Sequence, residues 1–394
     1  MSDAPQTAPD NSIRIPPAAQ PPETLGQAVA WLEGEAHRII RASVRRMTDG
    51  TAAFPPQVGI NYEAFWLRDY AYALEGSIRS FSDRELTEAC RLFVRSLRED
   101  GAAVDCVAFD GTPIYKPGYG SMGREPVADG PPFTVSVAWQ TWKRTNDREL
   151  LNAVLDPLVK TMTWLPRNPD NGLVHIAEPG ERCPYGFTDT IPKVGDVLFC
   201  SLLAVQASRQ LGELLDAAGR ADEAARWRGE GARITAGIRS TMWIEDTGLF
   251  RAATVKCNVP DIWGSAFAVW LSVATDEQSQ RIAGYFREHY DELVMHGQIR
   301  HIPGFTDWDG NRVAENGGDY QSGAFWATPV GWFVFALDRL DPALADRTVI
   351  GMVKHFQQHG ANEWINAKEC RLAGYLASAA LPLAGIRDMM ARRS

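Results

Sequence analysis

The sequence of 394 residues contains no apolar run that approaches the about 18 residues needed to span a membrane. It also lacks a long Lys/Arg run, and its net charge is -9, so the electrostatic footprint of a nucleic-acid-binding protein is missing. The first residues show neither a basic start nor an apolar core, which argues against a secretory signal. We therefore expect a globular protein that binds neither membranes nor nucleic acid.

Motifs for metals, nucleotides and reactive serines are also lacking. The six cysteines are scattered without a CxxC pair, and we expect them to be reduced and mostly buried in a cytoplasmic protein. No GxGxxG, GxxxxGK[ST] or GxSxG motif is present. His355 and His359 have a spacing that can bind metal, but without carboxylates or cysteines beside them we expect a solvated helix end. We predict no metal and no cofactor.

The N-terminal residues 1–24 are polar and rich in proline, which predicts a disordered or loosely draped arm. The remaining length, 25–394, suits either two domains or one large closed architecture. The helix pattern described next favours a single domain. Nothing in the sequence indicates the oligomeric state.

Two kinds of predicted helix alternate along this domain. One kind is charged and amphipathic, and comprises 25–47, 82–100, 146–160, 220–239, 276–293 and 342–357. The other carries little charge, and comprises 66–79, 133–142, 197–208, 261–273, 329–337 and 373–386. An amphipathic helix buries one stripe, whereas an apolar helix is buried on every side. Strict alternation therefore predicts an all-α fold, an (α/α)6 toroid with the apolar helices as its inner ring.

Local signals add detail to this barrel. Thr328 and Pro329 are typical of an N-cap and a first helical position, and Pro382 should kink or break the last inner helix. Residues 101–116 are the best candidate for a short β-hairpin, with Asp110 and Gly111 as its turn.

The connections from outer to inner helices are long, at roughly 100–132, 165–196, 240–261, 290–328 and 358–373. In an alternating barrel these loops emerge at one mouth, where a rigid scaffold builds its sites. Trp, Tyr, Asp and Glu concentrate in the same loops. Sugar hydroxyls bind carboxylates, amides and Arg, and aromatic rings cover the C–H faces of sugars. The mouth is therefore predicted to bind a small carbohydrate.

The segment NYEAFWLRDY, residues 61–70, is the most informative of these loops. Arg68 and Asp69 open an otherwise apolar helix, two residues after Trp66. A buried charged pair must be paired or must hold something polar. Together the three side chains can grip a sugar ring, although an ion pair that caps a buried helix would explain the same residues.

Four short motifs, in order, are similar to elements of a known family. They are FWLRDYAYAL at 65–74, GFTDTIPKVGD at 186–196, GAFWATPVGWFVFAL at 323–337 and NEWIN at 362–366. The chain thus resembles the six-hairpin glycosidases, closest to the α-glucosidase-I-like, trehalase-like and glucoamylase-like branches. The resemblance implies that Arg68 and Asp69 bind sugar hydroxyls in subsite −1, that Asp189 is the general acid and that Glu363 is the general base. Glu315 is the reserve base.

The chain departs from this family in two respects. Residues 1–24 are too few to form the N-terminal β-sandwich domain of the larger members, and the sequence lacks the trehalase signature Q-W-D-x-P-N-G-W. The identity of the sugar is therefore not carried over. We predict that the chain hydrolyses a small α-glycoside or oligosaccharide with inversion, using two carboxyl groups. The predicted substrate-binding residues are Trp66, Arg68, Asp69, Tyr119, Tyr185, Lys193, Asp261, Trp263, Gln321, Trp326 and Trp364.

Several alternatives stay open at this point. Trp263 and Trp326 could equally belong to the barrel core, Asp189 could be an N-cap, and Glu363 could be a salt-bridged loop residue. A sugar epimerase or isomerase on the same barrel would use histidines, of which His301 is the first candidate. An unsaturated-uronide hydrolase would need several Arg or Lys residues. A non-catalytic sugar-binding protein would bind sugars without releasing any.

Overall fold

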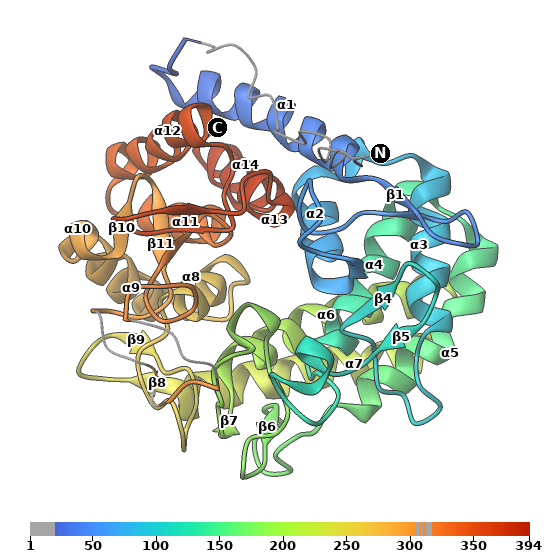
Figure 1. The fold of residues 1–394 in the computed structure, drawn as a ribbon. Coiled ribbons are helices and arrows are strands. Elements are labelled where there is room, and N and C mark those ends of the chain that lie inside the picture. Colours follow the sequence, from blue (N-terminus) through green and yellow to red (C-terminus); the bar gives the residue numbers. More distant parts are fainter. Residues whose placement is uncertain (1–19, 305–307, 309, 313–316) are drawn as a thin grey trace, which may run out of the picture.

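The computed structural model describes residues 20–304, 308, 310–312 and 317–394. Its helices form a closed ring in two layers (Figure 1). The outer layer comprises α1 (Leu25–Ser43), α3 (Asp83–Arg95), α5 (Arg148–Trp164), α7 (Ala221–Gly237), α9 (Asp276–Glu288) with the short α10 (Tyr290–Leu293), and α12 (Pro342–His359). The inner layer comprises α2 (Leu67–Ser77), α4 (Gly130–Thr145), α6 (Leu198–Ala217), α8 (Ile262–Trp270), α11 (Val330–Leu337), and α13 (Leu376–Ala380) with α14 (Pro382–Arg393). The predicted (α/α)6 toroid is confirmed.

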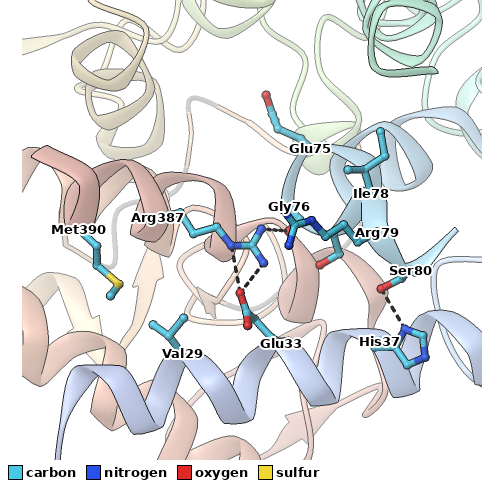
Figure 2. Close-up of a pocket in the computed structure, with 11 residues that line it drawn as sticks. Val29, Glu33, His37, Glu75, Gly76, Ile78, Arg79, Ser80, Arg387 and Met390 are labelled. Atoms are coloured by element: carbon cyan, nitrogen blue, oxygen red, sulfur yellow. Dashed lines mark hydrogen bonds and ion pairs between the residues drawn. The ribbon is translucent and has the colours of Figure 1, made fainter. Parts of the chain in front are cut away.

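The inner helices pack side by side in chain order, and α13 and α14 close the ring against α2. Glycines allow the inner helices α11 and α14 to pack very closely. A Cβ atom on Gly331 of α11 would lie 2.4 Å from the carbonyl oxygen of Pro382 in α14. The outer helix α1 completes the closure. Arg387 of α14 donates to Glu33 of α1 and, at 2.7 Å, to the carbonyl oxygen of Gly76 in α2 (Figure 2).

Most helix boundaries follow local sequence signals. Thr24, Ser82 and Thr275 form capping boxes at the starts of α1, α3 and α9, which satisfy the first free N–H groups of these outer helices. Pro382 separates α13 from α14, as expected.

The predicted N-cap at Thr328 is wrong. Helix α11 begins at Val330 with Pro329 in the N-cap position, because the Val330 N–H already closes a turn onto the Ala327 carbonyl oxygen at 3.0 Å. The Thr328 hydroxyl has no hydrogen-bond partner among the described residues.

Short strands tie the loops together at the mouth. The predicted hairpin within 101–116 is present as β4 (Cys106–Ala108) and β5 (Pro113–Ile114), and β3 (Ala64–Trp66) pairs antiparallel with β4. An unpredicted antiparallel sheet joins β10 (Val294–Met295), β11 (Gln298–Arg300), β12 (Phe325–Trp326), β13 (Trp364–Ile365) and β14 (Cys370–Arg371). Three further pairs are β1 (Arg45–Arg46) with β2 (Ala52–Ala53), β6 (His175–Ile176) with β7 (Gly195–Asp196), and β8 (Trp243–Ile244) with β9 (Leu249–Phe250).

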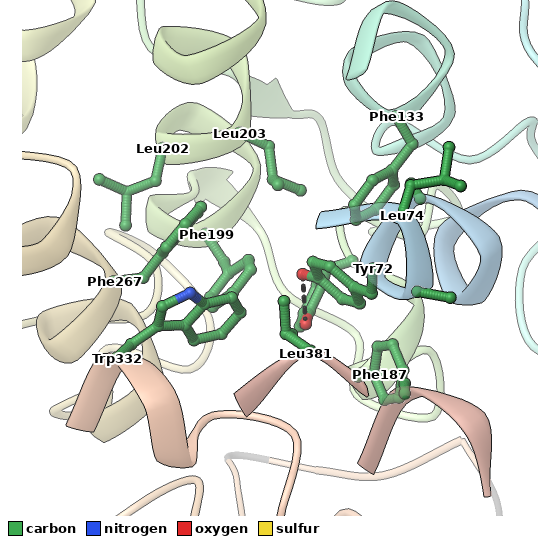
Figure 3. Close-up of a cluster of buried hydrophobic side chains, with 14 of the residues drawn as sticks. Tyr72, Leu74, Phe133, Phe187, Phe199, Leu202, Leu203, Phe267, Trp332 and Leu381 are labelled. Atoms are coloured by element: carbon green, nitrogen blue, oxygen red, sulfur yellow. Dashed lines mark hydrogen bonds between the residues drawn. The ribbon is translucent and has the colours of Figure 1, made fainter. Parts of the chain in front are cut away.

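The barrel axis is filled by a buried aromatic cluster (Figure 3). Tyr72, Phe133, Phe199 and Trp332 come from four inner helices, and Phe187 reaches the same cluster from a mouth loop. The Tyr72 hydroxyl is satisfied by a hydrogen bond with the Tyr185 hydroxyl at 2.9 Å. Because aromatic side chains occupy the centre, the barrel is a packed core with a floor beneath the mouth rather than a tunnel.

Two further expectations can be compared with the structure. The cysteines are indeed mostly buried, with Cys370 exposed. The predicted solvated helix end holds for His359, which is exposed at the last position of α12. It is wrong for His355, whose side chain is buried against the strand that carries Gln298 and stacks on His296. Within the described residues no helix has the length and apolar character of a membrane span. Most of the predicted N-terminal arm, residues 1–19, lies outside the described residues.

Candidate active site

A small polar cavity opens at the mouth of the barrel, in front of the inner-helix N-termini. It holds about 320 Å³ of empty space, which includes its opening to solvent. Its walls come from the segments in front of four inner helices, α2, α6, α11 and α13, and from the first turn of α2. The lining residues are Tyr62, Trp66, Arg68, Asp69, Gly186, Phe187, Asp189, Tyr320, Glu363 and Tyr375.

Asp189 follows the short 3-10 turn Gly186–Thr188 that interrupts the loop before α6. Its carboxylate accepts a hydrogen bond from Gln321 Nε2 at 2.9 Å. The backbone N–H and hydroxyl of Thr190 both donate to Gln321 Oε1, at 3.0 and 2.6 Å, which fixes the orientation of the amide. Burial raises the pKa of Asp189 to about 7, although the Gln321 hydrogen bond and the charge of Arg68 oppose the rise. A carboxyl group in this state can hold a proton near neutral pH.

Glu363 lies across the same cavity, immediately before β13. The hairpin β13–β14 fixes its backbone through a hydrogen bond from its N–H to the Arg371 carbonyl oxygen at 2.9 Å. Its side chain accepts a hydrogen bond from the Tyr62 hydroxyl at 2.7 Å. Burial raises the pKa of Glu363 to about 8; Tyr62 lowers it, and the charges of Asp69 and Asp189 raise it. The two predicted catalytic carboxyl groups are therefore close enough to sense each other.

Asp69 is the third carboxyl group of the cavity and lies in the first turn of α2. The partial positive charge of that helix end favours its ionised form. Tyr375, the residue before α13, donates its hydroxyl to Asp69 Oδ1 at 2.9 Å. Burial raises the pKa of Asp69 to about 6, and the charge of Arg68 counteracts this effect.

Arg68 is buried between two other carboxylates. Its guanidinium donates to Asp105 at 2.6 Å and to Asp129 at 3.0 and 3.3 Å. Asp129 also accepts the backbone N–H of Gly186 at 2.8 Å, and a Cβ atom on Gly186 would lie 1.9 Å from Arg68 Cζ. The expectation that Arg68 forms a buried ion pair at the start of this helix therefore holds in part. Arg68 forms ion pairs, but its partners are Asp105 and Asp129 rather than Asp69. These contacts join α2 to the loop that carries Asp189.

The other predicted binding residues do not line this cavity. Trp263 is fully buried and stacks on His301, with ring centroids 3.3 Å apart, and Trp326 packs edge-on against Phe187 in the core. Tyr185 is buried beneath the cavity in the aromatic cluster.

Lys193 and Asp261 do not line the cavity, and both form hydrogen bonds elsewhere. Lys193 donates to the Thr188 hydroxyl at 2.5 Å, and Asp261 is the N-cap of α8, accepting from the Gly264 N–H at 2.8 Å. Gln321 reaches the site only through Asp189. Trp364 is largely buried, and Tyr119 is 71% exposed. The reserve base Glu315 lies outside the described residues.

The sequence analysis did not single out three of the lining residues, Tyr62, Tyr320 and Tyr375. Tyr62 lies two residues before β3. It packs edge-on against Trp66, the last residue of that strand, with ring centroids 5.0 Å apart. Tyr375 directly precedes α13, but the predicted inner helix 373–386 begins before it, so the sequence pattern did not place Tyr375 at the mouth.

The described residues contain no group of three or more His, Cys, Asp or Glu side chains arranged to hold a metal ion. The carboxyl groups of the cavity are instead held by Tyr62, Gln321 and Tyr375. As it stands, this arrangement offers proton donors and acceptors around a small space.

Comparison with known proteins gives matches of fold. No protein-family model matches the chain, and no curated protein matches it in sequence. Among solved structures, the GH63 mannosylglycerate hydrolase of Thermus thermophilus in complex with glucose aligns with a TM-score of 0.64 and 16% identity, over 91% of this chain and 100% of that one. A complex of the same hydrolase with Tris and D-glycerate aligns equally well.

Two rhamnosidases show the same likeness over part of their length. The enzyme of Klebsiella oxytoca with rhamnose bound has a TM-score of 0.63 and 13% identity, over 94% of this chain and 65% of its own. The GH78 enzyme of Bacillus sp. GL1 has a TM-score of 0.63 and 15% identity, over 93% and 36%. The chain therefore shares the helical toroid fold of these glycoside hydrolases.

Proposed function

We propose that this protein is a glycoside hydrolase that cleaves a small α-glycoside or oligosaccharide with inversion of configuration. The observation that carries the proposal is the placement of Asp189 and Glu363 on one small cavity, each with a raised pKa and each held by a neutral hydrogen-bond donor. Glycoside hydrolysis needs two such groups, one that donates a proton and one that accepts one. The glycoside hydrolases that share this fold support the same chemistry.

The proposed reaction is a single displacement. The protonated Asp189 gives its proton to the glycosidic oxygen as the bond from that oxygen to the anomeric carbon breaks. Glu363, ionised, takes a proton from a water molecule on the opposite face, and the water oxygen forms the new bond to the anomeric carbon. The Tyr62 hydroxyl, 2.7 Å from Glu363 Oε1, favours the ionised form that this role needs.

The remaining cavity residues are proposed to hold the sugar. Asp69, oriented by Tyr375, would accept hydrogen bonds from hydroxyl groups, and Trp66 would cover a C–H face of the ring. The edge of Arg68 that borders the cavity can donate to a hydroxyl, while its other donors hold Asp105 and Asp129. The proposed setting is the cytoplasm, which fractionation of the source cells would test.

The test of this function is to follow the released sugar by NMR. The protein is incubated with a panel of aryl α- and β-glycosides and disaccharides, and the first anomer formed is recorded before mutarotation. We expect an α-substrate to give a β-product. A product of retained configuration would contradict inversion, epimer formation without release would point to an epimerase, and binding without any turnover would leave a sugar-binding protein.

The pH dependence of kcat/KM should be bell-shaped, with its maximum at neutral to slightly alkaline pH. The active form carries one proton, on Asp189, and the pKa values of about 7 for Asp189 and about 8 for Glu363 place the singly protonated pair near neutral pH. In the free protein this order of pKa values favours the proton on Glu363, so the proposed active form is the minor of the two singly protonated forms and the assignment of roles rests on the family resemblance. Below this interval both groups are protonated and the base is lost; above it both are ionised and the acid is lost. An optimum near pH 4, where unperturbed carboxyl groups titrate, would contradict the prediction.

Two variants should move this profile in a stated direction. Tyr62→Phe removes the hydrogen bond that lowers the pKa of Glu363, and Gln321→Leu removes the one that lowers the pKa of Asp189. Each loss raises a pKa, so both profiles should shift toward higher pH. Tyr285→Phe, on the outer helix α9, is the control and should leave the profile in place.

A further inference from the structure

The cavity at the mouth holds several carboxyl groups that have no counter-ion of their own. Asp69, Asp189 and Glu363 line it, and none of the three forms an ion pair among the described residues. Their side-chain hydrogen-bond donors are two tyrosine hydroxyls and one amide, all of them uncharged. Buried carboxylates are stabilised when a cation pairs with them, so the absence of one needs an explanation.

Arg68 is the only cation among the described residues that line this cavity, and its charge is already matched. Its guanidinium pairs with Asp105 at 2.6 Å and with Asp129 at 3.0 Å, and both of these aspartates are buried. Their charge reaches the cavity: in addition to burial, Asp105 raises the pKa of Asp69, and both aspartates raise the pKa of Asp189. One guanidinium therefore faces two aspartates before the carboxyl groups of the cavity are counted.

Neighbouring segments do not supply the missing positive charge. Lys193 does not line the cavity; its ammonium group donates to the Thr188 hydroxyl, and its strongest electrostatic partner is Asp261. Those residues between 305 and 316 that lie outside the described structure include three acidic residues and no Lys or Arg. A balancing cation is therefore expected from a ligand.

The proposed reaction leaves one of the three carboxyl groups free for such a ligand. Asp189 faces the glycosidic oxygen and Glu363 faces the attacking water, so Asp69 remains for a substituent of the sugar ring. Its Oδ1 atom accepts the Tyr375 hydroxyl at 2.9 Å, which fixes the carboxylate in place. Its position in the first turn of α2 favours the ionised form. Asp69 thus offers a fixed negative charge beside the sugar.

We propose that the sugar bound in this cavity carries a protonated amino group, and that Asp69 binds this group. The inference rests on the proposed function, because it names the class of glycoside that the site would cleave, a glycoside of an amino sugar. An ammonium group has three N–H donors and no acceptor, which suits a cavity rich in carboxylates. A uronic acid would add negative charge to these carboxylates, and a neutral sugar would leave their charge unbalanced.

The test is calorimetric titration of the full chain with methyl α-glycosides. The set comprises the neutral glycoside, its 2-amino, 3-amino and 6-amino deoxy derivatives, and the corresponding uronide, each in the glucose and the mannose series. We expect at least one amino derivative to bind about tenfold or more tightly than its neutral parent, because a charge-assisted hydrogen bond replaces a neutral one. The uronides should bind about tenfold or more weakly than the neutral parents.

A variant of Asp69 locates the amino group. Asp69→Asn keeps the size and hydrogen-bonding capacity of the side chain but removes its charge, and should reduce the preference for the amino derivative about tenfold. Glu63→Gln is the matched control: this exposed carboxylate follows Tyr62 directly but does not line the cavity, so the variant should keep the preference. Circular dichroism checks that both variants are folded, and the comparison of ligands on the wild type depends on neither.

Four outcomes would each overturn the proposal: equal affinity for amino and neutral glycosides, tighter binding of a uronide, no saturable binding of any amino glycoside, or an unchanged preference in folded Asp69→Asn. Equal affinity would mean that the carboxylates serve only the positive charge that develops at the anomeric carbon during the reaction. Binding is measured without turnover, so hydrolysis of a neutral glycoside would leave the proposed function intact in all four cases. Preferential binding of an amino glycoside without release from any glycoside would contradict the hydrolase instead.

Discussion

Glu363→Gln is expected to lower kcat by about 10²–10⁴-fold, the usual contribution of a positioned proton acceptor. The change keeps the size of the side chain and its contact with Tyr62, but an amide cannot take a proton from water. Substrate binding should change little, because the proposed sugar contacts come from Asp69, Arg68 and Trp66. Steady-state kinetics and a direct binding measurement on the variant separate the two effects.

Sodium azide sharpens the assignment of roles. Azide is an anion that needs no general base, so it should restore turnover of Glu363→Gln and yield a glycosyl azide of inverted configuration. Asp189→Asn should behave differently: its activity should recover on a dinitrophenyl glycoside, whose leaving group needs no proton, and not on addition of azide.

The matched control is Glu315→Gln, at the reserve base. If Glu363→Gln turned over normally while Glu315→Gln did not, the assignment of the base to Glu363 would fail. Loss of folded structure in Glu363→Gln, seen by circular dichroism, would call for Glu363→Asp, which keeps the charge and moves it back by one methylene.

Arg68→Met should lower the free energy of unfolding by about 3–5 kcal/mol, the typical effect of removing one partner of a buried ion pair. Asp105 and Asp129 are both buried, and each loses its ion-pair partner in this variant. Urea unfolding followed by circular dichroism measures the loss. We expect kcat to fall as well, because the Arg68–Asp129–Gly186 contact holds the loop that positions Asp189.

Two comparisons separate burial from charge. Arg84→Met removes an exposed ion pair with Glu88 and should change the free energy of unfolding by no more than about 1 kcal/mol. Arg68→Lys keeps the charge but loses the planar fork that reaches both carboxylates, so an intermediate loss is expected. An Arg68→Met variant as stable as the wild type would show that Asp105 and Asp129 do not need the guanidinium.

The barrel could be predicted because its pattern spans whole helices. Charge-free runs such as 197–208 and 329–337 are long enough to show that every face is buried, and these runs lie in α6 and α11. Apart from the β4–β5 hairpin, the strands could not be predicted, because strands such as β12 and β13 have two residues each and alternation needs more. Their pairing partners come from loops distant in sequence.

The site could be predicted only in part. Asp189 and Glu363 were assigned through the family resemblance, and Asp69 and Trp66 through the charged pair that opens an apolar helix; all four line one cavity. The direction of a side chain is not visible in sequence: Trp263 and Trp66 have similar positions, yet the first points into the core. Tertiary packing around His301 decides this, and no local pattern reports it.

The aromatic floor of the barrel has a kinetic consequence. Phe187 lines the mouth cavity and also belongs to the cluster that includes Tyr72, so the cavity is closed below. A sugar seated there can leave only by the route through which it came. Under the proposed reaction the leaving group lies on the outer side and must depart first, and the sugar follows as the last product. Under the same proposal, such a pocket would accept only the terminus of an oligosaccharide, and chains would be shortened one unit at a time from an end.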